Sequence, residues 1–106
     1  MAEGSEAIVV LMTAPTTGEA SEIARMLVAE RLAACVQILP EIQSIYRWQG
    51  EVQNEKEVLL LAKTIASRFD ELESKVRAMH SYETPEIIAL PVTAASEPYL
   101  KWLLEN

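Results

Sequence analysis

The sequence predicts a single α+β domain in which two helices cover one face of a four-stranded antiparallel sheet, with a short helix added at the C-terminal end. Segments with strand-like apolar runs alternate with segments of helical periodicity in the order βαββαβ. Right-handed crossover connections then place both helices on the same side of the sheet, which is the ferredoxin-like arrangement. The 106 residues leave room for one domain, residues 1–106.

The first strand and the first helix are predicted from the N-terminal quarter of the chain. AIVVLM at 7–12 is a continuous apolar run that is typical of a strand buried on both faces, and Pro15 ends it. Thr16 with Glu19 three residues later matches a capping box, so a helix should begin here. Its buried stripe should consist of the apolar residues at helical spacing, Ala20, Ile23, Ala24, Leu27 and Val28.

Two long strands, 35–48 and 51–64, are predicted to form a central hairpin. Pro40 has no backbone N–H for a sheet ladder, so a bend or bulge should interrupt the first of these strands. Gln49 and Gly50 should make the tight turn between them, because glycine readily adopts the positive φ that such turns require.

The second helix is predicted to begin at Ser67, with Asp70 as the acidic partner of its cap, and Pro85 bounds it on the C-terminal side. A strand at 86–92 and a short helix opened by SEP at 96–98 should follow. The buried stripe of the second helix should consist of Phe69, Leu72, Val76 and Met79.

The length of the hairpin predicts an oligomer. A helix of about 14 residues is ~20 Å long, whereas strands of about 14 residues reach ~45 Å. Much of the hairpin should therefore extend beyond its own helices, although it carries the apolar side chains of Ile42, Ile45, Tyr46, Trp48 and Val52. Such an edge favours pairing with other chains in a closed ring. The alternative is a hairpin that twists back onto its own domain.

Charge and composition exclude several classes of partner. The formal net charge of −7 disfavours binding to nucleic acid or to an anionic membrane surface and attracts cations. No apolar stretch reaches the ~20 residues needed for membrane insertion, and the N-terminal apolar run lacks the basic flank of a signal peptide. Cys35 is the single cysteine, so no internal disulfide forms, which favours a cytoplasmic location.

Four separated motifs resemble the CutA divalent-cation-tolerance family. They are AACV at 33–36, SIYRWQG at 44–50, EVLL at 57–60 and HSYETPEIIALP at 80–91. The similarity extends over nearly the whole chain. One departure is Ser81, where the family usually has proline, and we expect it to loosen this loop. The resemblance implies a homotrimer of ferredoxin-like subunits, similar in architecture to PII signalling proteins, that binds copper and takes part in divalent-cation tolerance.

The resemblance also implies a candidate metal site. In some relatives a cysteine and two successive histidines bind copper, and the matching positions here are Met12, Met79 and His80. Thioether sulfurs suit Cu(I), so copper is the expected cofactor. The alternative for the two methionines is core packing, and for His80 it is a role at the end of the helix. Cys35 should be a small buried hydrophobe rather than a reactive thiol.

A second candidate site involves aromatic and charged residues of the hairpin and of the loop before the last strand. In a trimer these elements are expected to meet between subunits and form a cleft for a small ligand. Packing of the subunit interface is the alternative role for the aromatic side chains. The residues are Tyr46, Trp48, Lys63, Tyr82 and Glu83.

No enzyme is predicted. The chain has three glycines and no glycine-rich phosphate loop, and its single histidine leaves little choice of catalytic base. The first functional hypothesis is a cytoplasmic homotrimer that binds copper and other divalent cations in metal-ion tolerance. The alternative is a PII-like regulatory or scaffold trimer that binds a small metabolite or a partner protein in its intersubunit clefts.

Overall fold

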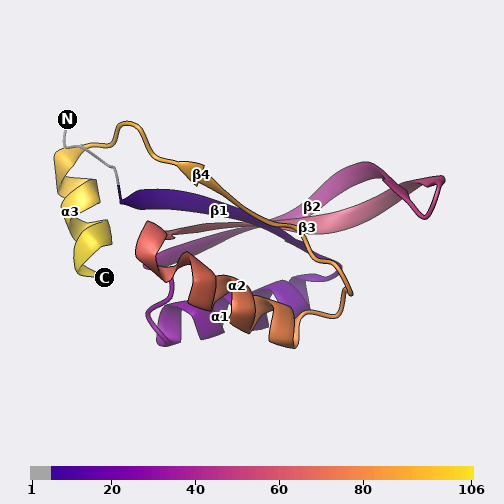
Figure 1. The fold of residues 1–106 in the computed structure, drawn as a ribbon, viewed down its shortest axis with the longest axis horizontal. Helices are drawn as coiled ribbons and strands as arrows, with labels where there is room; N and C mark the ends of the chain where they lie inside the picture. The colour runs from indigo at the N-terminus through magenta and orange to yellow at the C-terminus, as the bar shows by residue number, and fades with distance from the viewer. Residues whose placement is uncertain (1–5) are drawn as a thin grey trace.

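The computed structural model describes residues 6–106, and it confirms the predicted order of elements (Figure 1). The strands form one antiparallel sheet in the order β2-β3-β1-β4, as a ferredoxin-like βαββαβ chain requires. The elements are β1 (Ala7–Ala14), α1 (Thr17–Ala29), β2 (Cys35–Trp48), β3 (Glu51–Ile65), the 3-10 turn η1 (Ala66–Arg68), α2 (Phe69–Met79), β4 (Ile87–Pro91) and α3 (Glu97–Glu105).

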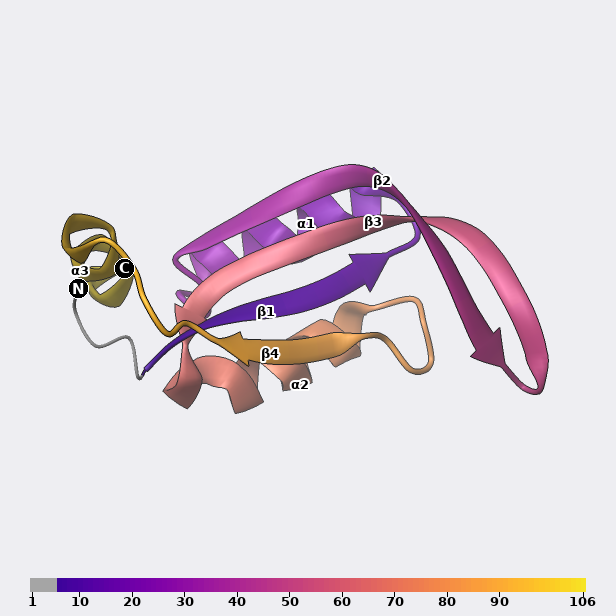
Figure 2. The ribbon, with the colours of Figure 1, turned by 90° about the horizontal axis from the view of Figure 1, so that it is seen from above.

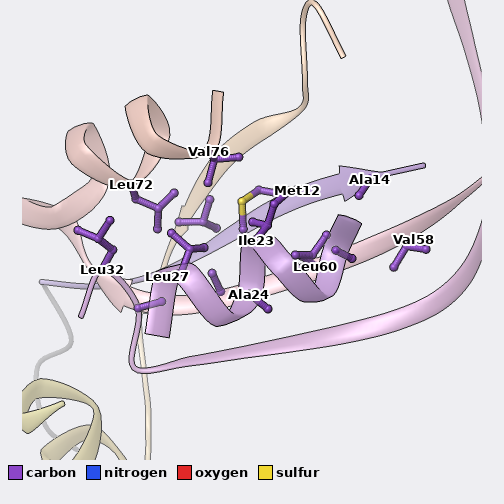
Figure 3. Packing of buried hydrophobic residues seen from close by; sticks show 14 of the residues in the cluster. Met12, Ala14, Ile23, Ala24, Leu27, Leu32, Val58, Leu60, Leu72 and Val76 are labelled. Carbon is purple, nitrogen blue, oxygen red and sulfur yellow. The ribbon is translucent and has the colours of Figure 1, made fainter. Parts of the chain in front are cut away.

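The main core lies between the sheet and the two helices α1 and α2, which cover the same face (Figures 1 and 2). Side chains of Met12 and Leu60 point from the sheet toward Ile23, Leu27 and their neighbours (Figure 3), and all four are fully buried. Because side chains alternate along a strand, the odd-numbered residues of β1 and β3 occupy the other face of the sheet. Neither α1 nor α2 covers that face, and α3 covers it only at the end near Ala7, so Val9 and Leu11 in the middle of β1 stay partly exposed within one chain.

The first helix follows the prediction closely. The Thr16 hydroxyl accepts a hydrogen bond from the backbone N–H of Glu19 at 3.1 Å, which is the N-cap contact of the capping box. Most of the expected stripe is buried, but Val28 is 46% exposed, because it lies at the edge of the stripe near the end of the helix.

The predicted cap of the second helix is wrong. Ser67 lies inside the η1 turn, and the residue with extended backbone before that turn is Ile65, which has no side-chain oxygen. An N-cap side chain needs extended backbone to reach back to the helix amides, so Ser67 cannot serve. Asp70 lies in the first turn of α2, where its negative charge interacts favourably with the positive end of the helix dipole. Met79, expected on the buried stripe, is 37% exposed.

The hairpin of β2 and β3 extends well beyond the two helices (Figure 1) and helps give the molecule a longest dimension of 44 Å. Its register shifts between Leu39 and Ile42, which confirms the irregularity predicted at Pro40. At the tip, Gln49 and Gly50 both have positive φ, 51° and 83°, as expected for a tight turn whose twist matches that of the strands.

The helix α3 packs at the opposite end of the sheet from the hairpin tip (Figures 1 and 2). Ser96 caps it, as predicted, by accepting a hydrogen bond from the N–H of Tyr99 at 3.4 Å. Ala7, Leu100 and Leu103 form a small buried cluster of their own, separate from the main core.

Candidate functional site

A cleft of about 550 Å³ lies on the sheet face opposite α1 and α2, where β1 ends, the hairpin extends, and the loop from α2 to β4 passes. Figure 2 shows these segments at the same end of the molecule. The lining combines three aromatic rings, four glutamates and several small polar groups, and among residues 6–106 no basic side chain contributes to it. The lining residues are Thr13, Ser44, Tyr46, Trp48, Gln53, Glu55, Glu57, Ser81, Tyr82, Glu83, Thr84 and Glu86.

The hairpin half of the cleft is built by strand alternation and register. Ser44, Tyr46 and Trp48 lie two residues apart on β2, so they share one face. Ser44 pairs with Glu55 and Tyr46 with Gln53 in the register of β2 and β3, which places polar and aromatic side chains next to each other. The polar patterning of the hairpin therefore creates one continuous acidic and aromatic wall.

Two tyrosine–glutamate hydrogen bonds organise this wall. The Tyr46 hydroxyl donates to Glu55 Oε1 at 3.0 Å, and the Tyr82 hydroxyl donates to Glu57 Oε2 at 2.8 Å. The hydrogen bond to Glu55 raises the pKa of Tyr46 above its usual value. Burial, followed by the hydrogen bond to Glu57, raises the pKa of Tyr82 well above that of a free phenol. Both phenols therefore stay neutral donors at physiological pH.

His80 anchors the loop half of the cleft. Its side chain is fully buried, its Nε2 lies 2.7 Å from the carbonyl oxygen of Thr13, and its Nδ1 lies 3.0 Å from the backbone N of Tyr82. A backbone N–H can only donate, so Nδ1 must accept and Nε2–H donates to Thr13. Both ring nitrogens are thus engaged in hydrogen bonds that tie the loop to β1.

Glu19 fastens the same loop from α1. Its Oε2 accepts hydrogen bonds from the N–H of Ser81 at 2.9 Å and from the Ser81 hydroxyl at 3.0 Å, and it lies 3.4 Å from His80 Nδ1. The expectation that Ser81 loosens this loop is therefore wrong. A proline here would have neither the N–H nor the hydroxyl, so serine supplies two contacts that proline cannot make.

The three residues of the implied metal site differ in how deeply their side chains are buried. Met12 is fully buried in the core, Met79 is 37% exposed at the end of α2, and His80 is held as described above. Across residues 6–106 no group of three or more His, Cys, Asp or Glu side chains is arranged to hold a metal ion. Copper binding by these three residues stays a prediction.

Four of the five residues predicted for the cleft come together in one chain: Tyr46, Trp48, Tyr82 and Glu83 line it. Lys63 does not. It lies near the other end of β3, opposite Val9 and Cys35, with its ammonium 5.6 Å from the centre of the Tyr99 ring. Cys35 is half-buried rather than fully enclosed.

Sequence reasoning missed the acidic half of the cleft, above all Glu55 and Glu57. Glu57 is only 7% exposed although it is a carboxylate. The available signal was the spacing along 51–57, since residues 53, 55 and 57 share a face with the aromatic residues of β2 once the hairpin register is known.

The fold and the cleft define a class: a small α+β protein with a ferredoxin-like sheet, an extended hairpin and a cleft whose charge attracts cations. Residues 8–106 match the model of the CutA1 divalent ion tolerance protein family. The chain belongs to this family.

Named relatives that are similar in sequence support this family assignment. The chain is 53% identical over 98 residues to the divalent-cation tolerance protein CutA of Thermus thermophilus, covering 92% of this chain and 95% of that one. It is 47% identical to the chloroplastic protein CutA of Arabidopsis thaliana over 96 residues, 91% of this chain but 53% of that longer protein.

Solved structures extend the agreement to the fold. The Thermus thermophilus structure superimposes with a TM-score of 0.92 at 52% identity, covering 94% of this chain and 97% of that chain. A structure described as the periplasmic divalent cation tolerance protein CutA of Archaeoglobus fulgidus superimposes with a TM-score of 0.88 at 37% identity. The match covers 92% of this chain and 94% of that chain. The α+β fold with its long hairpin is therefore that of the CutA structures.

Proposed function

We propose that this chain acts as a homotrimeric, non-catalytic protein of the cytoplasm that binds copper and other divalent cations and thereby contributes to metal-ion tolerance. Membership of the divalent ion tolerance family carries this proposal. The net charge of −7 and the acidic cleft are consistent with a protein whose ligands are cations.

The sheet face opposite α1 and α2 supports the oligomer. Between α3 and the cleft it carries large apolar side chains, and Ile88 and Leu90 on β4 are 50% and 48% exposed in the single chain. Their antiparallel partners on β1 are Leu11 and Val9, so the apolar surface is continuous across strands. An open apolar sheet face beside a long unpaired hairpin is covered most economically by further copies of the same chain.

Copper is proposed because thioether and imidazole ligands suit Cu(I). An ion at His80 has to replace either the hydrogen bond to Thr13 or the one from Tyr82, since both nitrogens are engaged. Met79 is accessible beside it, whereas Met12 is enclosed in the core. The readiest pair of ligands is therefore Met79 and His80, with Met12 joining only if the core opens.

Native mass spectra with and without added Cu(I) test the assembly and the metal together. A trimer with one copper per chain, lost in His80→Gln and reduced in Met79→Leu, supports the proposal. Met26→Leu on α1 is the matched control and should keep its copper. A trimer that stays metal-free at modest copper excess overturns copper binding, and a mass of one chain at micromolar concentration overturns the oligomer.

The cytoplasmic location is proposed from the single cysteine, which leaves no disulfide that would require an oxidising compartment. Within the described part of the chain no helix is long and apolar enough to cross a membrane. The names of two relatives contain the words chloroplastic and periplasmic, so the family occupies several compartments. Fractionation with a compartment marker checks the location directly.

The cleft favours a second candidate function, a PII-like regulatory or scaffold trimer that binds a small metabolite or a partner protein. Its volume of about 550 Å³ is within the range of small-molecule sites. A thermal shift caused by a metabolite but not by copper would favour this function over the first.

A further inference from the structure

We propose that the cleft binds an organic cation, specifically a small flexible amine with two or more ammonium groups, held by the glutamates and the aromatic rings. This inference rests on the second candidate function, because it names the class of ligand for that cleft. It concerns a different site from the implied copper ligands Met12, Met79 and His80.

The first observation is a buried carboxylate that has no cationic partner. Glu57 is 7% exposed, and within residues 6–106 its carboxylate accepts one hydrogen bond, donated by Tyr82 to Oε2. Among residues 6–106 no Lys or Arg forms an ion pair with it. An enclosed carboxylate gains strongly from a counter-charge, because its own desolvation has already been imposed by the fold. Its second oxygen is free to accept a hydrogen bond from a ligand in the cleft.

The aromatic rings supply the second observation. Tyr46, Trp48 and Tyr82 line the same cleft as Glu57, and in the single chain Tyr46 and Trp48 are 38% and 43% exposed. The faces of such rings attract ammonium groups and also pack against the methylene carbons of an amine. Both tyrosine hydroxyls donate to glutamates, so the hydrogen bonds hold the two carboxylates against the wall of the cleft.

The spacing of the carboxylates favours an extended organic ligand over a metal ion. Glu55 and Glu57 are two residues apart on one strand face, which separates their backbones by about 7 Å. A single ion needs ligands that converge within about 2.5 Å of one point, and the described residues offer no such group of three. Two ammonium groups joined by a short carbon chain match carboxylates spread along a wall.

The test is a titration of the full-length oligomer with spermidine, a flexible polyamine. The fluorescence of Trp48, isolated in a Trp102→Phe background, reports binding at the cleft. The comparison ligands are 1,8-octanediol, which has a carbon chain but no charge, and MgCl2 at matched ionic strength. Glu57→Gln removes the buried charge and keeps an acceptor for Tyr82, whereas Glu22→Gln removes one charge from the exposed face of α1.

We expect saturable binding of spermidine, a Kd weakened by about tenfold or more in Glu57→Gln, and an unchanged Kd in Glu22→Gln. Trp48→Leu, at an exposed position, should weaken binding as well, with isothermal titration calorimetry as the readout. An equal loss of spermidine affinity in Glu57→Gln and Glu22→Gln would show general charge attraction and overturn the inference. Binding of octanediol as tight as that of spermidine would also overturn it.

The outcomes also separate this inference from the proposed functions. If a metabolite shifts the melting temperature while spermidine fails to bind, the regulatory function is supported and the inference that the cleft binds an amine is overturned. Copper counts from native mass spectra of the same samples report on the metal-tolerance function separately, because the mass of a bound copper ion differs from that of a bound amine.

Discussion

Replacing Met12 separates its two candidate roles, core packing and metal ligation. The side chain is fully buried between the sheet and the helices, where it lies among Ile23, Leu60 and Val76 (Figure 3). Met12→Ala deletes its Cγ, Sδ and Cε atoms and leaves a cavity, so the free energy of unfolding should fall by about 2–5 kcal/mol. Met12→Leu keeps the apolar volume and should cost less than about 1.5 kcal/mol.

The assay is guanidinium-induced unfolding at a fixed protein concentration, because the stability of an oligomer depends on concentration. Met79→Leu is the control: at 37% exposure it should change the free energy of unfolding by no more than about 0.5 kcal/mol. A loss below about 1 kcal/mol in Met12→Ala would refute the packing argument. A Met12→Leu variant of unchanged stability that loses copper would show that the sulfur is a ligand.

Three further predictions concern the hairpin, the loop and pH. Gly50→Ala should lower the free energy of unfolding by about 1 kcal/mol because the φ of 83° is strained for alanine, although nothing within 4 Å would clash; a stabilised variant in the same unfolding assay would contradict this. Glu19→Ala should cost about 1–2 kcal/mol through the lost contacts to Ser81 and should speed hydrogen exchange at residues 81–84; the control Glu22→Ala should do neither. Because the pKa of Tyr82 is raised in the folded state, its contribution to stability is present below about pH 10 and is lost as the pH rises further, when the unfolded chain ionises first. Tyr82→Phe should therefore show a shallower alkaline loss in unfolding experiments from pH 8 to pH 11, and parallel curves for the two proteins would disprove the assignment.

Much of the fold could be predicted because local signals and packing agree. Apolar periodicity places the strands and helices, Pro40 marks the irregularity of β2, and Gly50 marks the turn. The start of α2 could not be predicted from a capping pattern, because η1 takes the turn that contains Ser67. A 3-10 turn and the first turn of an α-helix accept the same residues, so composition alone does not distinguish them.

The cleft was only half predictable for a geometric reason. The aromatic residues form a recognisable pattern on β2, but the role of Glu57 depends on the hairpin register and on where the loop with Tyr82 folds back. Lys63 shares a sheet face with Glu57, yet six residues of strand separate them by about 20 Å. The hydrogen bonds of Ser81 to Glu19 join residues that are far apart in sequence, and no local pattern indicates them.

The separate small cluster under α3 makes the C-terminal end a distinct cooperative unit. Only Leu100 and Leu103 of this helix are fully enclosed, and they meet Ala7 rather than the main core. Opening of α3 therefore exposes far less apolar surface than global unfolding does, and its free energy should be correspondingly smaller. We therefore expect the first event on heating to be detachment of the C-terminal segment, while the sheet and its two covering helices stay folded.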